Sequence, residues 1–532
     1  MKVNIFKYIF IIVVIGLIVF SAYSIYKKND VVEETEKTEE VVAEKQQLSN
    51  IRIGISKYDN MNPLLSTNKM VQYVDKLIFE PLLSLNEDFS LSNCLAKEYS
   101  KTGDNTYLIK LRDDVKWHDG MPLVAKDVQF TIDRLKDGQI SSIYQENVRD
   151  VSQVEIIDEH TIKISLDKQV PFFEYNLIFP ILPNHYYIDE DFAQSTRTPI
   201  GTGMYKIGKM ESSFIELRKN ETWWNREQKD SKIDTITLNL YSSMGEVYNA
   251  FKIGNIDLIP TSNSNFNQYI GTIGFNVKEY TARKYDVLAI NTQNNVLQKR
   301  EVRQAIASAI DKNNIVATVY NNTYVTSNYP LDYGNYLYAG DLASQEYNPE
   351  YAQKLLEDNG WTLRYRQWQK VENYRTLITS FSLVVNASNV PRVAVAESIK
   401  NQLKEIGIEI SIRKVSDAQY RYYLENKNYD LILTGTNISA SPSLETYFGE
   451  GNLANFTDER VTNIMNSVNS INDKKMLKEN YRQLQQIYIE EVPYISLYRD
   501  KEYLVYSPNL VGELNPNWYN IFYNIENWYR QN

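Results

Sequence analysis

The stretch from Gly203 to Lys209 has the spacing closest to a nucleotide-binding motif. Gly203 and Gly208 are separated by four residues and followed by Lys209, as in a phosphate-binding loop. Met210 stands where that motif needs a Ser or Thr hydroxyl for Mg²⁺. Residues 214–219 then read as a short strand, whereas a phosphate needs a helix N-terminus after the loop. We therefore expect a tight turn at the glycines that leads into a hairpin, and no nucleotide site.

Side chains that perform covalent or metal chemistry are scarce in this sequence. It has three His, at positions 118, 160 and 185, and one Cys, Cys94. Their spacing matches neither a metalloprotease nor a serine-hydrolase motif, and His118 in the sequence WHDG is typical of a turn. Nickel and haem iron are held most readily by imidazole or thiolate. We therefore predict no enzyme activity, no metal site, no cofactor and no direct ligation of nickel or haem, while an already chelated metal stays open.

The overall composition is that of an acidic globular protein. Its 532 residues suffice for about three domains. The hydrophobic fraction of 43% and the charged fraction of 23% are ordinary for a folded chain, and a net charge of −10 speaks against a nucleic-acid partner. The 41 Tyr and 7 Trp would suit a surface that stacks on a ligand, although a general compositional bias explains their number equally well.

The N-terminal residues read as a membrane-targeting segment rather than as part of the fold. Residues 6–26 are almost entirely apolar and long enough to span a bilayer as a helix. A cleaved signal peptide, with a poor site at residues 21–23, is the alternative; we favour an uncleaved anchor over residues 1–28 with the folded part outside the cytoplasmic membrane. Cys94 lies too far away to accept a lipid anchor. Residues 29–50 are acidic and lack aromatic residues, which predicts a flexible linker.

A strand–helix–strand pattern stands out after residue 392. Residues 392–407 predict a helix with one apolar stripe and a C-terminal Gly407. The stripe consists of Val395, Ile399, Leu403 and Ile406. A strand, a helix and a buried strand are expected to follow (408–415, 417–425 and 429–434). An earlier strand and helix are predicted over 106–112 and 124–138. This alternation indicates an α/β fold with a largely parallel sheet covered by helices.

A set of segments occurs in the order and approximate spacing found in one known family. They are 115–135, 199–207, 220–225, 251–259, 290–311, 347–361 and 492–498. In these segments the chain resembles the family-5 extracellular solute-binding proteins, the receptors of ATP-driven importers for oligopeptides, dipeptides and nickel. The second segment, PIGTGMYKI, is similar to a glycine-containing turn of the family but carries Met204 in place of the usual Pro. The resemblance covers nearly everything after residue 50.

The resemblance implies a two-lobed periplasmic-binding-protein-like fold of type II with an extra inserted subdomain. Lobe one would comprise 51–78, 198–284 and 501–532; the insert would be 79–197 and lobe two 285–500. The sequence agrees at one point, because residues 281–292 read as an extended run between two differently patterned regions. Ligand would be enclosed when the lobes close about this hinge.

The best candidate for a ligand-binding loop follows the strand over 429–434. In an open parallel sheet, ligands bind beyond the carboxyl ends of the strands. The loop supplies Gly435, Thr436, Asn437, Ser439 and Ser441. Peptide-binding members of the family commonly hold an Asp here that pairs with the α-amino group of the peptide, and the nearest equivalent in this chain is Asn437. A neutral amide disfavours a buried ammonium and suits backbone amides or a neutral polar ligand.

Four further residues complete the predicted site. By the resemblance, Thr67 and Asn68 occupy the facing loop of lobe one, and Tyr285 and Asn291 lie at the hinge crossing. We therefore predict a monomeric receptor that delivers an extended oligopeptide, held mainly through its backbone, to membrane permease subunits. A receptor for a neutral oligosaccharide and a ligand sensor are the alternatives, and an amine-dependent dipeptide receptor is less favoured.

Overall fold

The computed structural model describes residues 12–23 and 47–531, apart from residues 139, 189–190, 193–194, 196, 345, 469–470 and 472. The chain divides into two compact units, one made of Met1–Leu48 with Gln531–Asn532 and the other of Ser49–Arg530. In the first unit, residues 12–23 are helical. A search of the described residues finds no helix with both the length and the apolar character needed to cross a membrane. Parts of the predicted anchor, 1–11 and 24–28, and residues 29–46 of the predicted linker lie outside the described residues, whereas Gln47–Leu48 at the end of that linker form strand β1.

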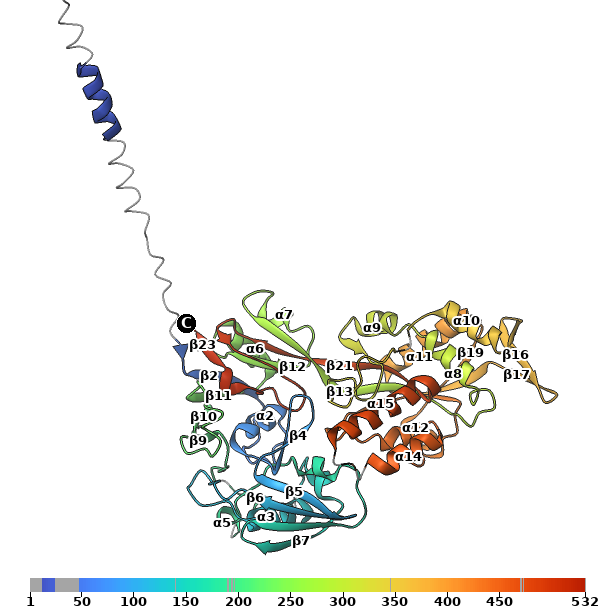
Figure 1. The fold of residues 1–532 in the computed structure, drawn as a ribbon, viewed down its shortest axis with the longest axis horizontal. Helices are drawn as coiled ribbons and strands as arrows, with labels where there is room; N and C mark the ends of the chain where they lie inside the picture. Colours follow the sequence, from blue (N-terminus) through green and yellow to red (C-terminus); the bar gives the residue numbers. More distant parts are fainter. Residues whose placement is uncertain are drawn as a thin grey trace, which may run out of the picture. The chain divides into compact units, whose positions relative to one another are not determined.

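One large sheet runs through the second unit (Figure 1). In the described part of the chain it has eleven strands in the order β19-β18-β20-β13-β21-β12-β2-β11-β10-β9, with β14 pairing with β21. The strands are β2 (Asn50–Ser56), β9 (Tyr205–Met210), β10 (Phe214–Lys219), β11 (Thr235–Tyr241), β12 (Leu258–Thr261), β13 (Asn276–Ile290), β14 (Tyr324–Thr326), β18 (Ser380–Asn386), β19 (Glu409–Val415), β20 (Leu431–Asn437) and β21 (Tyr494–Tyr506).

Parallel pairing occurs in two separate groups of strands. In the first group, β2 pairs in parallel with β11 and β12. In the second group, β18 pairs in parallel with β19 and β20. The second group contains the predicted strand–helix–strand pattern, with α11 (Val390–Glu405) before β19 and α12 (Asp417–Asn426) before β20. The predicted stripe of α11 is buried, with Val395 and Leu403 fully inaccessible, because this face packs against the sheet.

Gly407 ends this helix as the sequence predicted. Its φ of 87° is a left-handed conformation that L side chains rarely adopt. An added Cβ would also lie 2.7 Å from Leu363 Cδ1, so the position lacks room for a side chain. The backbone therefore turns directly from α11 into β19.

The glycines near residue 203 serve close packing rather than a nucleotide loop. Gly203 donates its N–H to the carbonyl of Ile78 at 2.9 Å, and a Cβ at Gly203 would lie 2.5 Å from the carbonyl oxygen of Leu77. The predicted hairpin is present as antiparallel β9 and β10. Gly208, which we expected in the turn, lies instead inside β9.

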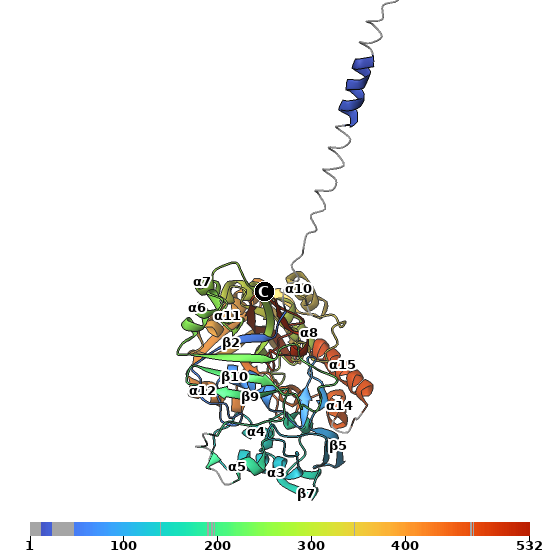
Figure 2. The same ribbon diagram turned by 90° about the vertical axis from the view of Figure 1, so that its left-hand side faces the viewer.

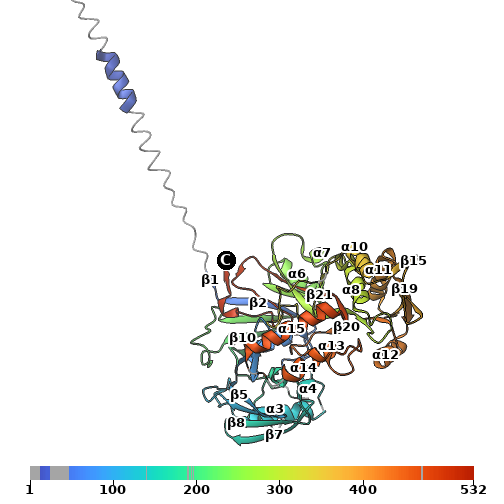
Figure 3. The same ribbon diagram turned by 45° about the vertical axis from the view of Figure 1, so that its right-hand side comes forward.

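Helices and a smaller sheet surround the large one. The helices of more than one turn are α2 (Lys69–Ile78), α3 (Ala125–Lys136), α6 (Met244–Lys252), α8 (Arg300–Ser308), α9 (Lys312–Tyr320), α10 (Pro349–Asp358), α14 (Glu459–Val468) and α15 (Lys474–Glu491), besides α11 and α12. The smaller sheet, β5-β6-β8-β7, contains β5 (Ala96–Gly103), β6 (Thr106–Leu111), β7 (Val151–Asp158) and β8 (Thr161–Leu166). It lies with α3 at the bottom of Figures 2 and 3. The predicted strand at 106–112 and helix at 124–138 correspond to β6 and α3.

Two long antiparallel strands, β13 and β21, link the two groups of parallel strands (Figure 1). Their pairing is regular over Asn276–Thr281 and resumes at Tyr285 after a register break; a second, smaller shift lies between Asp286 and Val287. We call residues 282–284 and 499–503 the crossing segment. The Lys284 N–H donates to Asp500 Oδ1 at 2.9 Å in this break. The extended run predicted at 281–292 is therefore confirmed as far as Ile290.

The predicted lobe boundaries at 284/285 and 500/501 coincide with this register break. Ser49–Arg530 nevertheless forms one compact unit that is not divided further. The division into two lobes and an insert therefore stays a prediction.

Candidate functional site

The carboxyl ends of both parallel strand groups converge on the crossing segment. The last residue of β20, Asn437, is the register partner of Lys284 in β13. The last residue of β12, Thr261, is the register partner of Tyr503 in β21. Ligands of open α/β sheets bind beyond the carboxyl ends of parallel strands. At the crossing segment the carboxyl ends of both strand groups lie close together. This makes it the candidate binding site.

A cavity of about 610 Å³ adjoins the crossing segment on the side of the first strand group. It is lined by the N-terminal turn of α2, the start of α6 and the ends of β2 and β12. In its wall, Lys69 Nζ lies 2.5 Å from Glu502 Oε1. The rings of Tyr248 and Tyr269 are stacked there at 5.0 Å with an interplanar angle of 13°. The cavity thus offers a flat aromatic surface beside a charge pair that neutralises itself.

The predicted binding loop lies on the side of the second strand group, but its first residues, Gly435, Thr436 and Asn437, belong to strand β20, which runs further than expected; the loop itself begins after Asn437. Thr436, Asn437 and Ser439 are exposed, whereas Gly435 is partly covered. Ser439 Oγ accepts a hydrogen bond from the Ser441 N–H at 3.2 Å, so these serines also shape the loop. The Asn437 side chain forms no hydrogen bond with a described residue. Its amide is therefore free to donate and accept at the edge of the site.

The two predicted residues of the facing loop start helix α2. Asn68 is its N-cap, where Oδ1 accepts from the Met70 N–H at 3.0 Å and Nδ2 donates to the carbonyl of Ser56 at 2.8 Å. The Thr67 N–H donates to Asp59 Oδ2 at 2.7 Å, and its side chain is exposed. Asn68 lines the 610 Å³ cavity, but its polar atoms are already used by the fold.

Tyr285 is buried and Asn291 is partly buried, and the fold engages the polar groups of both side chains. Tyr285 is 0% exposed, and its hydroxyl lies 2.6 Å from Ser496 Oγ. Asn291 Nδ2 donates to the carbonyl of Tyr429 at 2.9 Å, while its Oδ1 accepts from Asn455 Nδ2 at 3.1 Å. Tyr285 thus joins β13 to β21, and Asn291, directly after the end of β13, joins the chain to the segments that contain Tyr429 and Asn455.

Three residues at or beside the crossing segment were not predicted from the sequence, namely Arg283, Lys284 and Trp518. Arg283 is exposed, donates Nε to the carbonyl of Ile438 at 2.9 Å, and lies with Cζ 5.0 Å from the Trp518 ring centroid. Trp518 is 8% exposed, and its Nε1 has no hydrogen-bond partner among the described residues. The adjacent cations at 283–284 were visible in the extended run, but nothing in the sequence linked them to a tryptophan far along the chain.

The charges at the crossing segment are only partly balanced. The two side chains of Arg283 and Lys284 form no ion pair with a described carboxylate. Two residues further along β13, Asp286 forms a two-point ion pair with Arg392, both bonds being 2.8 Å. Burial raises the pKa of the Asp500 carboxyl, the acidic group closest to the break. The crossing segment therefore carries two cationic side chains outside any ion pair, with Asp500 as the acid beside Lys284.

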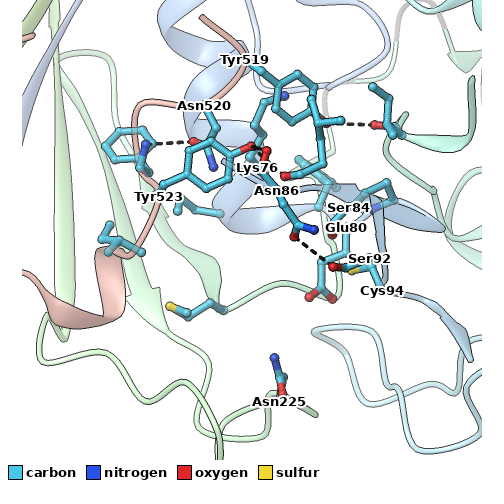
Figure 4. Close-up of a pocket in the computed structure, with 18 of the residues that line it drawn as sticks. Lys76, Glu80, Ser84, Asn86, Ser92, Cys94, Asn225, Tyr519, Asn520 and Tyr523 are labelled. Atoms are coloured by element: carbon cyan, nitrogen blue, oxygen red, sulfur yellow. Dashed lines mark hydrogen bonds between the residues drawn. The ribbon is translucent and has the colours of Figure 1, made fainter. Parts of the chain in front are cut away.

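A second cavity, of about 720 Å³, lies between α2, the β3–β4 hairpin (Leu83–Leu85, Leu91–Asn93) and residues 519–526 (Figure 4). Glu80 in its wall accepts hydrogen bonds from Thr202 at 2.8 Å, Trp223 Nε1 at 3.0 Å and Trp224 Nε1 at 2.9 Å. Burial raises the pKa of Glu80 to about 7. The fold itself satisfies this carboxylate, and the cavity does not lie at the carboxyl edge of the parallel strands.

Metal ligands are not grouped in the described part of the chain. Over those residues there is no set of three or more His, Cys, Asp or Glu placed to hold a metal ion. Cys94 is buried beside Glu80 in the 720 Å³ cavity.

Comparison with known proteins establishes the family. Residues 90–455 match the bacterial extracellular solute-binding proteins, family 5. Since this match covers more than half of the chain, the chain belongs to that family. It is accordingly a solute-binding receptor of the class that serves ATP-driven importers. Relatives of this class are receptors and not enzymes.

Individual relatives differ in what their names say they bind. The oligopeptide-binding protein AppA of Bacillus subtilis is 24% identical over 498 residues, which cover 88% of this chain and 89% of AppA. The nickel-binding periplasmic protein of Escherichia coli is 24% identical over 365 residues, covering 66% and 68% of the two chains. The family resemblance is thereby confirmed, whereas the ligand is not fixed by it.

Solved structures confirm the fold class. The murein tripeptide-binding protein MppA, in an unliganded open form, gives a TM-score of 0.77 at 18% identity and covers 91% of this chain and 98% of its own. AppA of Bacillus subtilis, in complex with a nonapeptide, gives a TM-score of 0.54 at 23% identity and covers 92% and 100%. The chain has the α/β fold of the type II periplasmic binding proteins.

Proposed function

We propose that this receptor binds an extended peptide at the crossing segment, mainly through the peptide backbone, and delivers it to an ATP-driven importer. The observation that carries the proposal is the meeting of both carboxyl strand edges at one place, beside the exposed amide of Asn437. The name of the relative AppA, an oligopeptide-binding protein, supports the ligand class.

The chemistry of the end of β20 and of the loop after it supports backbone recognition. Thr436, Asn437 and Ser439 offer hydroxyl and amide groups that both donate and accept. Peptide bonds need the same two functions. A desolvated α-ammonium group facing this loop would find no carboxylate in the loop and would lose several kcal/mol of solvation. The N-terminus of the peptide is therefore not the group that this loop selects.

Delivery requires that the protein signal its loaded state. Residues 282–284, opposite Asp500, are the place where β13 and β21 lose register, so they are the proposed hinge of closure. A ligand that binds the closed form better shifts the population towards it, with no covalent step. Permease subunits would read the closed form of a monomer. We further propose that residues 6–26 hold the protein at the membrane with its folded part outside.

A neutral oligosaccharide is the second candidate ligand. The stacked rings of Tyr248 and Tyr269 in the 610 Å³ cavity favour it, because sugar rings pack on such surfaces. The cavity adjoins the same crossing segment, so either ligand would bridge the two strand groups. Neither candidate uses nickel or haem held directly by the protein.

Mass spectrometry of the ligand that co-purifies with the intact protein tests this function. We expect oligopeptides and no sugar. Calorimetry with a bound peptide and its N-acetylated form then tests backbone recognition, and we expect affinities within a few-fold of each other because no acidic partner for the amine lies in the loop. Loss of binding on acetylation would show that such a partner exists, and a bound sugar would replace the peptide assignment.

A further inference from the structure

We propose that Arg283 and Trp518 form the position that selects a carboxylate carried by the ligand. In a peptide this group is the C-terminal carboxylate or an acidic side chain. The inference rests on the proposed peptide function and specifies which end or group of the peptide the crossing segment recognises.

Two unused donors lie close together in this region. The Arg283 guanidinium stacks on the Trp518 ring, with Cζ 5.0 Å from the ring centroid, and only its Nε is committed, to the carbonyl of Ile438. The two Nη nitrogens form no hydrogen bond with a described residue. The indole Nε1 of the same Trp518 is buried and unpaired within the described chain. A buried donor without a partner is costly, so an acceptor supplied by a ligand would relieve that cost.

The Trp518 ring is held in place from the other sides. Phe89 stacks on it with ring centroids 5.4 Å apart, and the Tyr73 hydroxyl donates to the Trp518 carbonyl at 3.3 Å. The ring, and with it the buried indole nitrogen, is therefore held in a fixed position. Such a prearranged donor binds an acceptor without paying for side-chain ordering at that moment.

The surrounding charges favour an anion at this position. Lys284 is exposed beside Arg283 and is not engaged in an ion pair with any described acid. Among the neighbouring acids, Asp286 is paired with Arg392 and Glu502 with Lys69. Glu279 on β13 is paired with Lys501, and Asp500 accepts from the Lys284 backbone N–H. Apart from Asp500, which interacts electrostatically with Lys284, each of these acids already has a cation, so at most one of the two positive charges of Arg283 and Lys284 is offset.

The loop that faces these cations does not supply the missing charge. Asn437, the register partner of Lys284, is a neutral amide, and Ser439 is a neutral hydroxyl. A carboxylate brought by the ligand would accept from the Arg283 guanidinium and from Trp518 Nε1, and such charge-assisted hydrogen bonds are stronger than neutral ones. The simpler view is that Arg283 only covers the Trp518 ring. The two views differ in whether removal of the charge affects carboxylate ligands selectively.

Calorimetry with four peptides and the full-length protein tests the proposal. The probes are pentaalanine as the free acid, its C-terminal amide, its N-acetyl form, and the C-terminal amide with a central Glu. We expect the C-terminal amide of pentaalanine to bind about tenfold more weakly than the free acid, because one charge-assisted interaction is lost. Recovery of affinity by the central Glu would show that an acidic side chain serves as well; no recovery would assign the position to the C-terminus.

Variants identify the residues responsible. Arg283→Gln should weaken the free acid about tenfold and leave the C-terminal amide unchanged. Trp518→Phe replaces the indole by a smaller aromatic ring without an N–H. It should weaken binding of the free acid alone, by a smaller factor. Arg366→Gln is the control, since Arg366 is exposed and lies in the β15–β16 turn (Thr362–Arg364, Gln367–Glu372). Thermal unfolding of each variant establishes that it is folded.

The possible outcomes separate the two proposals. Equal binding of acid and amide by the natural protein, or equal weakening of both by Arg283→Gln, would overturn the carboxylate assignment while the peptide function stands. If none of the four peptides binds the natural protein, the proposed function fails, and the inference fails with it.

Discussion

Two arginines of the crossing segment, Arg283 and Arg499, have opposite environments. Each stacks on an aromatic ring, with Cζ 5.0 Å from Trp518 in one case and 4.4 Å from Tyr285 in the other. Arg499 is 1% exposed, donates Nε to Asp332 at 2.8 Å and donates Nη2 to the carbonyl of Pro330 at 2.7 Å. Arg283 is exposed and has one backbone acceptor. The fold thus engages Arg499 and leaves most of the donors of Arg283 available.

The comparison distinguishes an arginine that stabilises the fold from one that remains available to a ligand. Residue type and aromatic stacking are the same for both arginines, so neither property decides the role. The deciding property is how far the fold uses the donors: Arg499 donates from Nε and Nη2 and leaves only Nη1 without a partner in the described chain, whereas Arg283 donates from Nε alone. Substituting Arg499 should destabilise the protein, and substituting Arg283 should change only what it binds.

Replacement of Arg499 should give the largest loss of stability. Arg499→Met removes the cation that faces Asp332, whose side chain is 11% exposed, and leaving a largely buried charge without its partner costs about 3 to 5 kcal/mol. Arg482→Met is the matched control, because Arg482 makes a two-point ion pair with Asp341 at the surface. An exposed pair contributes about 0 to 1 kcal/mol. Denaturant unfolding would measure both variants, and equal losses would show that burial does not distinguish the two pairs.

Glu80 is a buried carboxylate whose hydrogen-bond donors are all neutral, in contrast to the charged pair of Arg499 and Asp332. Its pKa is raised by burial from 4.5 to about 7, so the folded state binds the proton more tightly than the unfolded state. The resulting stabilisation is complete below pH 4.5 and is lost as the pH rises through about 7, a loss of about 3 kcal/mol. Glu80→Gln cannot ionise and should lack this part of the pH dependence.

Unfolding free energies of the natural protein and Glu80→Gln, measured from pH 4 to pH 8, provide the test. Their difference should change in favour of the Gln variant as the pH rises. The exposed Glu450 offers a control, since Glu450→Gln should run parallel to the natural protein. Parallel curves for Glu80→Gln as well would mean that Glu80 stays ionised in the folded protein.

Much of the fold was predictable because local patterns determine it. The apolar stripe of α11, the left-handed Gly407 and the strands around them depend on residues close in sequence. The extended run across the hinge was predictable for the same reason. The lobe boundaries do not follow from such local patterns, because a lobe is defined by how a whole strand group moves relative to the other.

The candidate site was only partly predictable because its residues come from distant parts of the chain. The loop after β20 followed from the rule for parallel strands, and the structure places it at the crossing segment. Tyr285 was assigned to the ligand, whereas β13 is buried on both faces from Tyr285 to Ile290, so its side chain lies in the core. Trp518 and Arg283 meet only through tertiary packing, which no sequence period reveals.

Substitution of Gly435 tests the ion pair between Asp286 and Arg392, and we expect a smaller loss of stability than for Arg499. A Cβ at this position would lie 2.1 Å from Asp286 Oδ1 and 2.4 Å from Arg392 Nη2. These atoms are fixed by their ion pair, so Gly435→Ala should displace it and cost about 1 to 3 kcal/mol, as overpacking does. Gly340→Ala, where the nearest atom would be at 3.6 Å, serves as the control in the same thermal unfolding experiment. A stable Gly435→Ala protein would show that the pair relaxes freely.

Tyr285 gives the smallest expected effect and the sharpest distinction between packing and binding. Tyr285→Phe keeps the ring on which Arg499 stacks and removes the hydroxyl that lies 2.6 Å from Ser496 Oγ. Ser496 keeps its contact with the Tyr488 hydroxyl at 2.8 Å, so the loss should be about 1 kcal/mol, the contribution of one hydrogen bond. Peptide affinity, measured by calorimetry, should not change, because the side chain is fully buried. Tyr422→Phe, at an exposed position, is the control for stability. A loss of affinity without a loss of stability would return Tyr285 to the ligand site and would mean that the crossing segment opens further than this conformation shows.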